Sequence, residues 1–340
     1  MEVGNENKRL PYLDYARVFV AYLVIFGHLL PNDDMTIRPY IYAFHMPFFF
    51  LVSGLLHKYT DKIQIKKYVF SLLIPFVFWN VLFVVLKPVL AWNDIWNGEF
   101  SQYTNWADYF FDFCKKGLLG ILLGKNGIDG PTWFLFALFW CKLGTDLIIK
   151  NRYFVVIYLI LYFVSVFVSN FIFIRQACMA LPFYYVGYYI KNNGYDQIIL
   201  KTGMNKKIWL SVLLLICSLI LTKFNGRVSM VGGRYGDFPK YISFWIFYFN
   251  GLVGSLSVLF ISSLFKENRW ITYSAISLIT ILCVQNFFIY TFKHTHGWWN
   301  YLYNELWIAL VILILCVIIH HFIDKYVPLA VGKGNYNKKG

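Results

Sequence analysis

The sequence predicts an all-α integral membrane protein, a bundle of about ten transmembrane helices with both termini in the cytoplasm. Only 14% of the 340 residues are charged, whereas a water-soluble domain carries about a quarter. Apolar residues make up 59% of the chain and gather in long runs. Lysine and arginine cluster between these runs, as topology signals do in membrane proteins. Lipid rather than water is therefore expected to touch most of the outside.

Ten segments are candidates to cross the roughly 30 Å of hydrocarbon, which takes about 20 mostly apolar residues. In chain order they are Tyr12–Leu30, Pro39–Leu56, Tyr68–Leu86, Pro131–Ile149, Tyr153–Ile174, Ala177–Ile190, Lys207–Thr222, Tyr241–Phe265, Trp270–Phe292 and Leu306–Ile323. The stretch Trp106–Gly124 is apolar only in its second half. We expect it to be interfacial or re-entrant, with an eleventh span left open.

The lysine and arginine distribution predicts the orientation. An even number of spans puts both termini on one side, and that side holds the larger share of the basic residues, so it should be cytoplasmic. Residues 1–330 are expected to form a single transmembrane domain, and residues 331–340 a disordered cytoplasmic tail. The loops 88–130 and 223–240 then face outward. Their Trp, Tyr, Gly and Asn residues suit a carbohydrate, but equally any wet membrane rim.

Composition also excludes several classes of protein. The net charge of +14 comes from short clusters between apolar runs, which argues against nucleic-acid binding. Most of the six cysteines lie in apolar runs without metal-ligand spacing, so neither disulfides nor a metal site is expected. Asp14 and Arg17 interrupt the first apolar run and no cleavage site follows, so no signal peptide is expected.

The first helix carries three ionisable residues, which at membrane depth usually face the bundle interior. Arg17 and His28 are eleven positions apart, about three turns, so they share one face about 16 Å apart along the axis. Asp14 lies one turn before Arg17 and can pair with it. Either Arg17 extends to the inner interface with Asp14 balancing it, or Arg17 binds a phosphate from the cytoplasmic side while His28 works deeper.

A second histidine is expected at the same depth as His28. His45 lies early in the second helix, and the two helices are antiparallel and joined by a short loop. Histidine is well suited to take a proton from a hydroxyl near neutral pH. Asp33 and Asp34 in the joining loop could hold the imidazolium once it forms. A single buried histidine is more often a packed core residue, but a pair at matching depth favours catalysis.

Several short motifs occur in a specific order along almost the whole chain. They are Arg9-Leu10-Pro11-Tyr12-Leu13-Asp14-Tyr15-Ala16-Arg17, then His28, Phe44-His45-Met46-Pro47-Phe48-Phe49-Phe50-Leu51-Val52-Ser53-Gly54, Pro131-Thr132-Trp133-Phe134-Leu135, Gly233-Arg234-Tyr235-Gly236-Asp237 and Ser274-Ala275-Ile276-Ser277-Leu278-Ile279. In these motifs the chain resembles the acyltransferase-3 family, closest to the branch related to fucose 4-O-acetylases. One departure is that Gln285-Asn286 stands where relatives often have a histidine, so acceptor choice could differ.

The resemblance implies a membrane O-acetyltransferase that moves an acetyl (acyl) group from acetyl-coenzyme A to a sugar hydroxyl of a cell-envelope glycan or glycolipid. The donor is a co-substrate, and no metal is implied. Arg17 and Asp14 would bind the donor, His28 would be the general base, and His45 would orient it or stabilise the oxyanion. A two-step route through an acetyl-histidine stays open. The expected location is a bacterial cytoplasmic membrane, with lipids and a glycan or lipid-linked sugar as partners.

Other positions have two readings each. Trp133 either begins a helix at the outer rim or stacks on a sugar. Tyr235 and Asp237 either build a turn or bind the acceptor. Gln285 either binds substrate or only contacts a neighbouring helix.

A transporter or flippase for a lipid-linked or acylated molecule is the competing hypothesis. The sequence shows neither an inverted repeat nor matched interrupted helices, which disfavours it.

Overall fold

The computed structural model describes residues 9–31, 34–91, 106–123, 130–167, 172–295 and 302–333. Within these ranges the chain is helical apart from its loops and one isolated bridge, between Ser229 and Arg234. The elements are α1 (Pro11–Leu29), α2 (Arg38–Leu55), α3 (Ile65–Tyr68), a π-helical turn η1 (Val69–Leu73), α4 (Ile74–Ala91), α5 (Trp106–Leu123), η3 (Gly130–Thr132), α6 (Trp133–Lys150), α7 (Phe154–Phe167), α8 (Ile174–Asn192), α9 (Asp196–Lys201), α10 (Met204–Asn225), α11 (Lys240–Ser262), α12 (Arg269–Ile276), α13 (Leu278–Thr295), α14 (Leu302–Tyr326) and η4 (Pro328–Val331).

The all-helical membrane architecture is confirmed, whereas the number of spans stays a prediction. Every one of the ten predicted segments contains a helix. Among the described residues, six helices are long and apolar enough to cross a bilayer, and a bent pair would make a seventh. The predicted spans in α2, α7 and α8 do not reach that length and apolarity. The orientation of the termini likewise remains a prediction.

The predicted span Trp270–Phe292 is not continuous. It is divided at Ser277 into α12 and α13, whose axes differ by 74°. Neither Pro nor Gly marks the break, so the sequence offers no local signal for it. Asn268 caps the short helix by accepting a hydrogen bond from the Trp270 backbone N–H, at 2.9 Å. The break places the Ser274–Ile279 motif beside α1, with Ala275 and Ser277 buried and Ile276 exposed.

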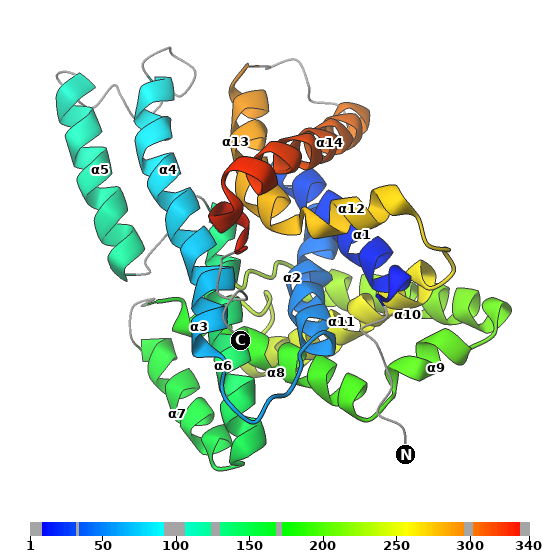
Figure 1. Cartoon of the computed structure of the whole chain (residues 1–340). Helices are drawn as coiled ribbons and strands as arrows, with labels where there is room; N and C mark the ends of the chain where they lie inside the picture. The colour runs from blue at the N-terminus through cyan, green and yellow to red at the C-terminus, as the bar shows by residue number, and fades with distance from the viewer. Residues whose placement is uncertain are drawn as a thin grey trace.

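The stretch expected to be interfacial or re-entrant forms one continuous helix, α5, which lies beside α4 (Figure 1). At the other end of the chain, η4 ends at Val331, and Lys333 forms an ion pair with Asp324 at 2.6 Å. The rest of the predicted tail lies outside the described residues, so its disorder stays a prediction.

Helices α1 and α2 form the middle of the bundle. Figure 1 shows α12, α13 and α14 on one side of them and α6 and α8 on the other. Most of α1 is buried, and it packs on α2, α11, α12, α13 and α14. Proline in the first turn of both α1 and α2 favours their beginnings, because a proline there forfeits no helical hydrogen bond. The polar residues predicted in α1 therefore face protein rather than lipid.

Helices α2 and α8 approach closely where each presents a glycine. A Cβ added at Gly54 would lie 1.9 Å from the carbonyl oxygen of Tyr184, and one added at Gly187 would lie 2.0 Å from that of Leu51. Only glycine fits at such a crossing, as in other membrane helix pairs built on small residues. This contact holds α2, and with it His45, in place against α8.

Candidate active site

Three cavities follow one another along α1. The first, the Arg17 chamber, has a volume of about 1040 Å³; the second, the middle cavity, about 190 Å³; the third, the His28 pocket, about 70 Å³. The chamber and the middle cavity share Arg17, Leu56, Leu278 and Ile279 in their walls. The middle cavity and the His28 pocket share Val24, Met46 and Leu282. Arg17 and His28 thus lie toward opposite ends of one series, on one unbroken helix.

The His28 pocket contains both predicted histidines. Besides His28 and His45, its wall is formed by Val24, Tyr42, Met46, Pro131, Trp133, Val228, Ser229, Met230, Val231 and Leu282. The structure thus brings the two predicted histidines together in one pocket, while their depth in the membrane stays a prediction. Trp133 is both the first residue of α6 and part of this wall, so its two predicted roles are compatible.

A tyrosine that the sequence analysis missed contacts His28. Tyr42 lies one turn before His45 on α2, and its Oη is 3.2 Å from His28 Nδ1. Arg38 donates a hydrogen bond from Nη2 to the same oxygen, at 3.2 Å, and its guanidinium lies over the Tyr42 ring. The phenol oxygen has two lone pairs, so it can accept from both Arg38 and a protonated His28 Nδ1. In that tautomer His28 Nε2 keeps its lone pair.

The tautomer of His45 follows from its backbone contact. Its Nδ1 is 2.9 Å from the carbonyl oxygen of Ile41, and a carbonyl can only accept, so Nδ1 carries the proton. The side chain is buried, with an exposed fraction of 6%. Its ring also packs edge-on against Tyr42, with centroids 4.8 Å apart. Neutral His45 therefore has its lone pair on Nε2.

The Arg17 chamber is strongly cationic. Its described lining contains four cationic side chains and one carboxylate. The cations are Arg9, Arg17, Lys58 and Lys191, and the carboxylate is Asp14. The other residues of its wall are Leu10, Leu13, Leu55, Leu56, His57, Gln197, Leu200, Ala275, Ile276, Leu278 and Ile279. Lys191 also pairs with buried Asp196, at 2.6 Å. The positive charges thus come from α1 and from the ends of α2 and α8. A wall with this excess of positive charge suits a ligand with several phosphates.

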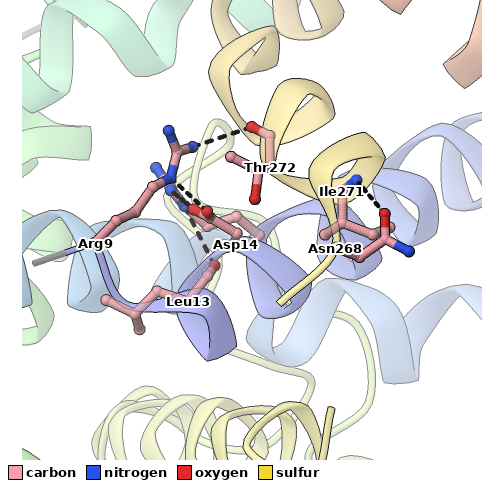
Figure 2. A network of polar contacts seen from close by, with 7 residues as sticks. Arg9, Leu13, Asp14, Asn268, Ile271 and Thr272 are labelled. Carbon is pink, nitrogen blue, oxygen red and sulfur yellow. Dashed lines mark hydrogen bonds and ion pairs between the residues drawn. The ribbon is translucent and has the colours of Figure 1, made fainter. Parts of the chain in front are cut away.

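Asp14 is shared between two arginines. Its carboxylate is buried, with an exposed fraction of 1%, and pairs with Arg17 on one oxygen and Arg9 on the other. Figure 2 shows Arg9 also donating to the carbonyl oxygen of Thr272 on α12, at 3.0 Å. Asp14 thus fixes two guanidinium groups at the chamber wall rather than offering itself to an anion. The predicted Asp14–Arg17 pair is confirmed, and Arg9 is a further member that the sequence analysis left without a role.

A second buried polar cluster, in which His57 lies beside Asp146, borders the chamber and was not predicted. His57 Nε2 lies 3.0 Å from Asp146 Oδ1, while Tyr184 contacts His57 Nδ1 at 2.8 Å. Tyr68 donates to the other Asp146 oxygen, at 2.7 Å. Through these contacts the cluster of His57, Asp146, Tyr184 and Tyr68 links four parts of the fold. Its members are widely separated in the sequence, and no short motif marks them.

Asp33 lies outside the described residues, and Asp34 stabilises the beginning of α2. The Asp34 carboxylate accepts hydrogen bonds from the backbone N–H groups of Thr36, Ile37 and Arg38. Burial acts to raise its pKa, but these hydrogen bonds and one from the Thr36 hydroxyl outweigh it and lower the pKa to about 2. Asp34 therefore positions Arg38 and, through it, Tyr42.

Tyr235 and Asp237 build the loop between α10 and α11 rather than line the His28 pocket. Asp237 pairs with Arg234 and accepts from the Arg227 backbone N–H at 2.8 Å. Tyr235 contacts the Tyr162 hydroxyl and packs on Phe244 with ring centroids 5.3 Å apart. These contacts support the turn reading. They hold the strip Val228–Val231, which forms one wall of the pocket.

The comparisons with known proteins identify the family. The pattern of the acyltransferase domain family, Acyltransferase 3, matches residues 10–330. The chain belongs to this family. The matched region thus runs from α1 into η4 and, apart from Arg9, contains the walls of all three cavities. The resemblance seen in the motifs is confirmed.

Two relatives of this acyltransferase are rhizobial. It is 34% identical over 153 residues to nodulation protein NolL of Mesorhizobium japonicum, covering 40% of the chain and 35% of the relative. It is 29% identical over 158 residues to NolL of Sinorhizobium fredii, covering 42% of the chain and 37% of the relative. The matched region is thus about a third of the length of these curated relatives. No solved structure matches the chain.

Proposed function

We propose that the protein is a membrane O-acetyltransferase that moves an acetyl group from acetyl-coenzyme A to a sugar hydroxyl of an envelope glycan or glycolipid. The observation that carries the proposal is the series of cavities along α1, with cations at one end and two histidines at the other. Membership of the acyltransferase family supports the reaction class. The membrane helices and the rhizobial relatives support a bacterial cytoplasmic membrane.

The shape of the donor supports this assignment. Coenzyme A carries phosphates at one end and its thioester at the end of a long, narrow arm. The cationic Arg17 chamber suits the phosphates, and the middle cavity, lined mostly by apolar side chains, suits the arm. Arg17 and His28 are about 16 Å apart along a continuous helix, a separation comparable to that between the two ends of the donor.

The two histidines supply the proton transfer. The acceptor hydroxyl oxygen attacks the thioester carbonyl carbon while His28 Nε2 takes the hydroxyl proton. The carbon–sulfur bond then breaks, and the proton passes to the thiolate, giving the sugar ester and free coenzyme A thiol. His45 orients the acceptor or stabilises the oxyanion, for which its protonated form would be the donor. An acetyl-histidine intermediate remains the alternative route.

The acceptor approaches from the outer side in this proposal. Trp133 and the strip Val228–Val231 form the outer wall of the His28 pocket, so they are the residues nearest to an incoming sugar. The proposed contribution of four further residues to acceptor binding is indirect, through the shape of the loops that contain them. These residues are Asp33, Asp34, Tyr235 and Asp237. A transporter is not favoured, because among the described helices the bent pair α12 and α13 has no counterpart in the first half.

The test uses protein purified in lipid nanodiscs with radiolabelled acetyl-coenzyme A, with thiol release as the readout. Wild type is compared with His28→Ala and Arg17→Ala. Matched controls are His321→Ala on an exposed position of α14 and Arg152→Ala in the exposed loop before α7.

We expect His28→Ala to abolish thiol release and Arg17→Ala to raise the donor KM about tenfold or more, since it removes a charged hydrogen-bond partner. Both controls should behave as wild type. Absence of thiol release by wild type with water or a panel of sugar glycosides would refute the proposed donor. Unchanged turnover in His28→Ala would refute the assigned site.

A further inference from the structure

Gln285 is a buried side chain with an unused hydrogen-bond acceptor. It lies on α13 with an exposed fraction of 1%. Its Nε2 donates to the carbonyl oxygen of Leu282 at 3.5 Å, which identifies the other amide atom as Oε1 because a carbonyl can only accept. Oε1 has no hydrogen-bond partner among the described residues. A buried acceptor of this kind destabilises the protein unless a donor reaches it.

The unused oxygen belongs to the wall of the middle cavity. Apart from Arg17, Ser53 and Gln285, the described wall of that cavity is apolar. Arg17 stands at the chamber end, which it shares with the larger cavity. Gln285 is therefore a polar group in the wall of an otherwise apolar cavity. There a ligand rather than the fold can supply the missing hydrogen-bond donor.

The depth of Gln285 indicates which part of a ligand it meets. Leu282, one helical turn earlier on α13, lines both the middle cavity and the His28 pocket. Leu278 and Ile279, two turns earlier, belong to the chamber end. Gln285 thus lies beside the reacting end of the series and far from the phosphate-binding end.

On this basis, and resting on the proposed acetyl-coenzyme A donor, we propose that Gln285 Oε1 accepts a hydrogen bond from the amide N–H of the cysteamine segment. That amide is separated from the thioester sulfur by only two carbons, so it follows the acetyl group into this part of the passage. The contact selects thioesters that carry an amide at this position, and it fixes how far the acetyl group enters the His28 pocket.

Two short donors isolate this single hydrogen bond. One is the acetyl thioester of N-acetylcysteamine, which has the amide. The other is its oxyester analogue, in which an oxygen replaces the amide N–H. The measured quantity is the ratio of kcat/KM for the two donors in wild type, Gln285→Leu and Gln285→Met. Gln285→Met keeps an unbranched chain of similar length and serves if the leucine variant does not fold.

The matched control is Gln176→Leu on α8; any effect that it has through Val231, which lines the His28 pocket, falls on both donors alike and leaves their ratio unchanged. Gln176 is also a buried glutamine with an unused Oε1, but it donates to the carbonyl oxygen of Val231 and lies outside the middle cavity. The same chemical change is thus made away from the passage.

We expect wild type and Gln176→Leu to prefer the amide donor about tenfold, the usual value of one buried hydrogen bond. The two Gln285 variants should show a ratio near one, through slower use of the amide donor alone. Equal ratios in wild type and the Gln285 variants, with acetyl-coenzyme A still consumed, would overturn the assignment of Gln285 and leave the proposed function intact. No consumption of acetyl-coenzyme A by wild type would overturn both.

Discussion

Tyr42 and His28 face one another between α1 and α2, with the tyrosine Oη 3.2 Å from His28 Nδ1. Arg38 donates to the same oxygen, so three side chains from α1 and α2 form one chain of contacts. A group that fixes one ring nitrogen decides which nitrogen can take a proton. Tyr42 is therefore a positioning residue for the proposed base.

Replacing Tyr42 with Phe tests this role. The ring remains to pack on His45, but the oxygen that fixes His28 is lost. We expect kcat to fall about tenfold to a hundredfold, by analogy with other groups that orient a histidine, with little change in donor KM. Steady-state kinetics with acetyl-coenzyme A separate the two constants. Tyr40→Phe, on the same helix and outside the pocket, is the control; an unchanged kcat in Tyr42→Phe would contradict the role.

Lys58 provides the corresponding test at the phosphate end. It lines the Arg17 chamber just after α2, whereas Lys62, equally exposed in the same loop, lies outside the chamber. We expect Lys58→Gln to raise the donor KM about threefold to tenfold and to weaken its dependence on salt, because one charge–charge attraction is removed. Lys62→Gln should leave both unchanged. Measurements in neutral-lipid nanodiscs exclude an effect through anionic lipid headgroups, and equal KM values for the two variants would argue against a donor chamber here.

The part of the site that the sequence predicted is the part that depends on local geometry. Helix periodicity alone places Arg17 and His28 on one face, and a short loop brings His45 to the same depth. Both predictions agree with the cavities observed. The prediction that Trp133 begins a helix is confirmed, whereas its place at the outer rim stays a prediction.

What the sequence did not predict depends on contacts between distant segments. The pair formed by His57 and Asp146 joins residues 89 positions apart, and no motif links them. No proline or glycine marks the break at Ser277, so the sequence predicted α12 and α13 as one long helix. Without that break, the position of Gln285 in the cavity wall could not be inferred.

The α2–α8 crossing predicts which glycines tolerate a methyl group. Gly187→Ala should strongly destabilise the fold, by about 2–3 kcal/mol or more, because the added Cβ would clash with the Leu51 carbonyl oxygen. Gly144→Ala on α6 is the control, since its Cβ would meet its nearest neighbour, a Leu181 side-chain carbon, at 3.6 Å. Thermal unfolding in detergent measures both. Equal melting temperatures would mean that the two helices do not approach this closely.

The Asp34 carboxylate gives a stability that depends on pH. Its pKa in the folded chain is about 2, below its ordinary value of 3.8, so the ionised form stabilises the fold. The stabilisation is complete well above pH 4 and is lost as the pH falls through about 2, where the folded form also takes up a proton. Asp34→Ala should therefore reduce stability by about 1 kcal/mol at pH 7, the usual value of a capping interaction.

The difference between wild type and Asp34→Ala should shrink toward zero near pH 2. Thermal unfolding in an acid-stable detergent at pH 7, 4 and 2.5 measures this trend. Asp61→Ala, which removes an exposed carboxylate from the loop after α2, is the control and should have little effect at any pH. A difference that stays constant across this range would show that the hydrogen bonds of Asp34 do not stabilise the beginning of α2. Arg38 and Tyr42 would then need another explanation for their position beside His28.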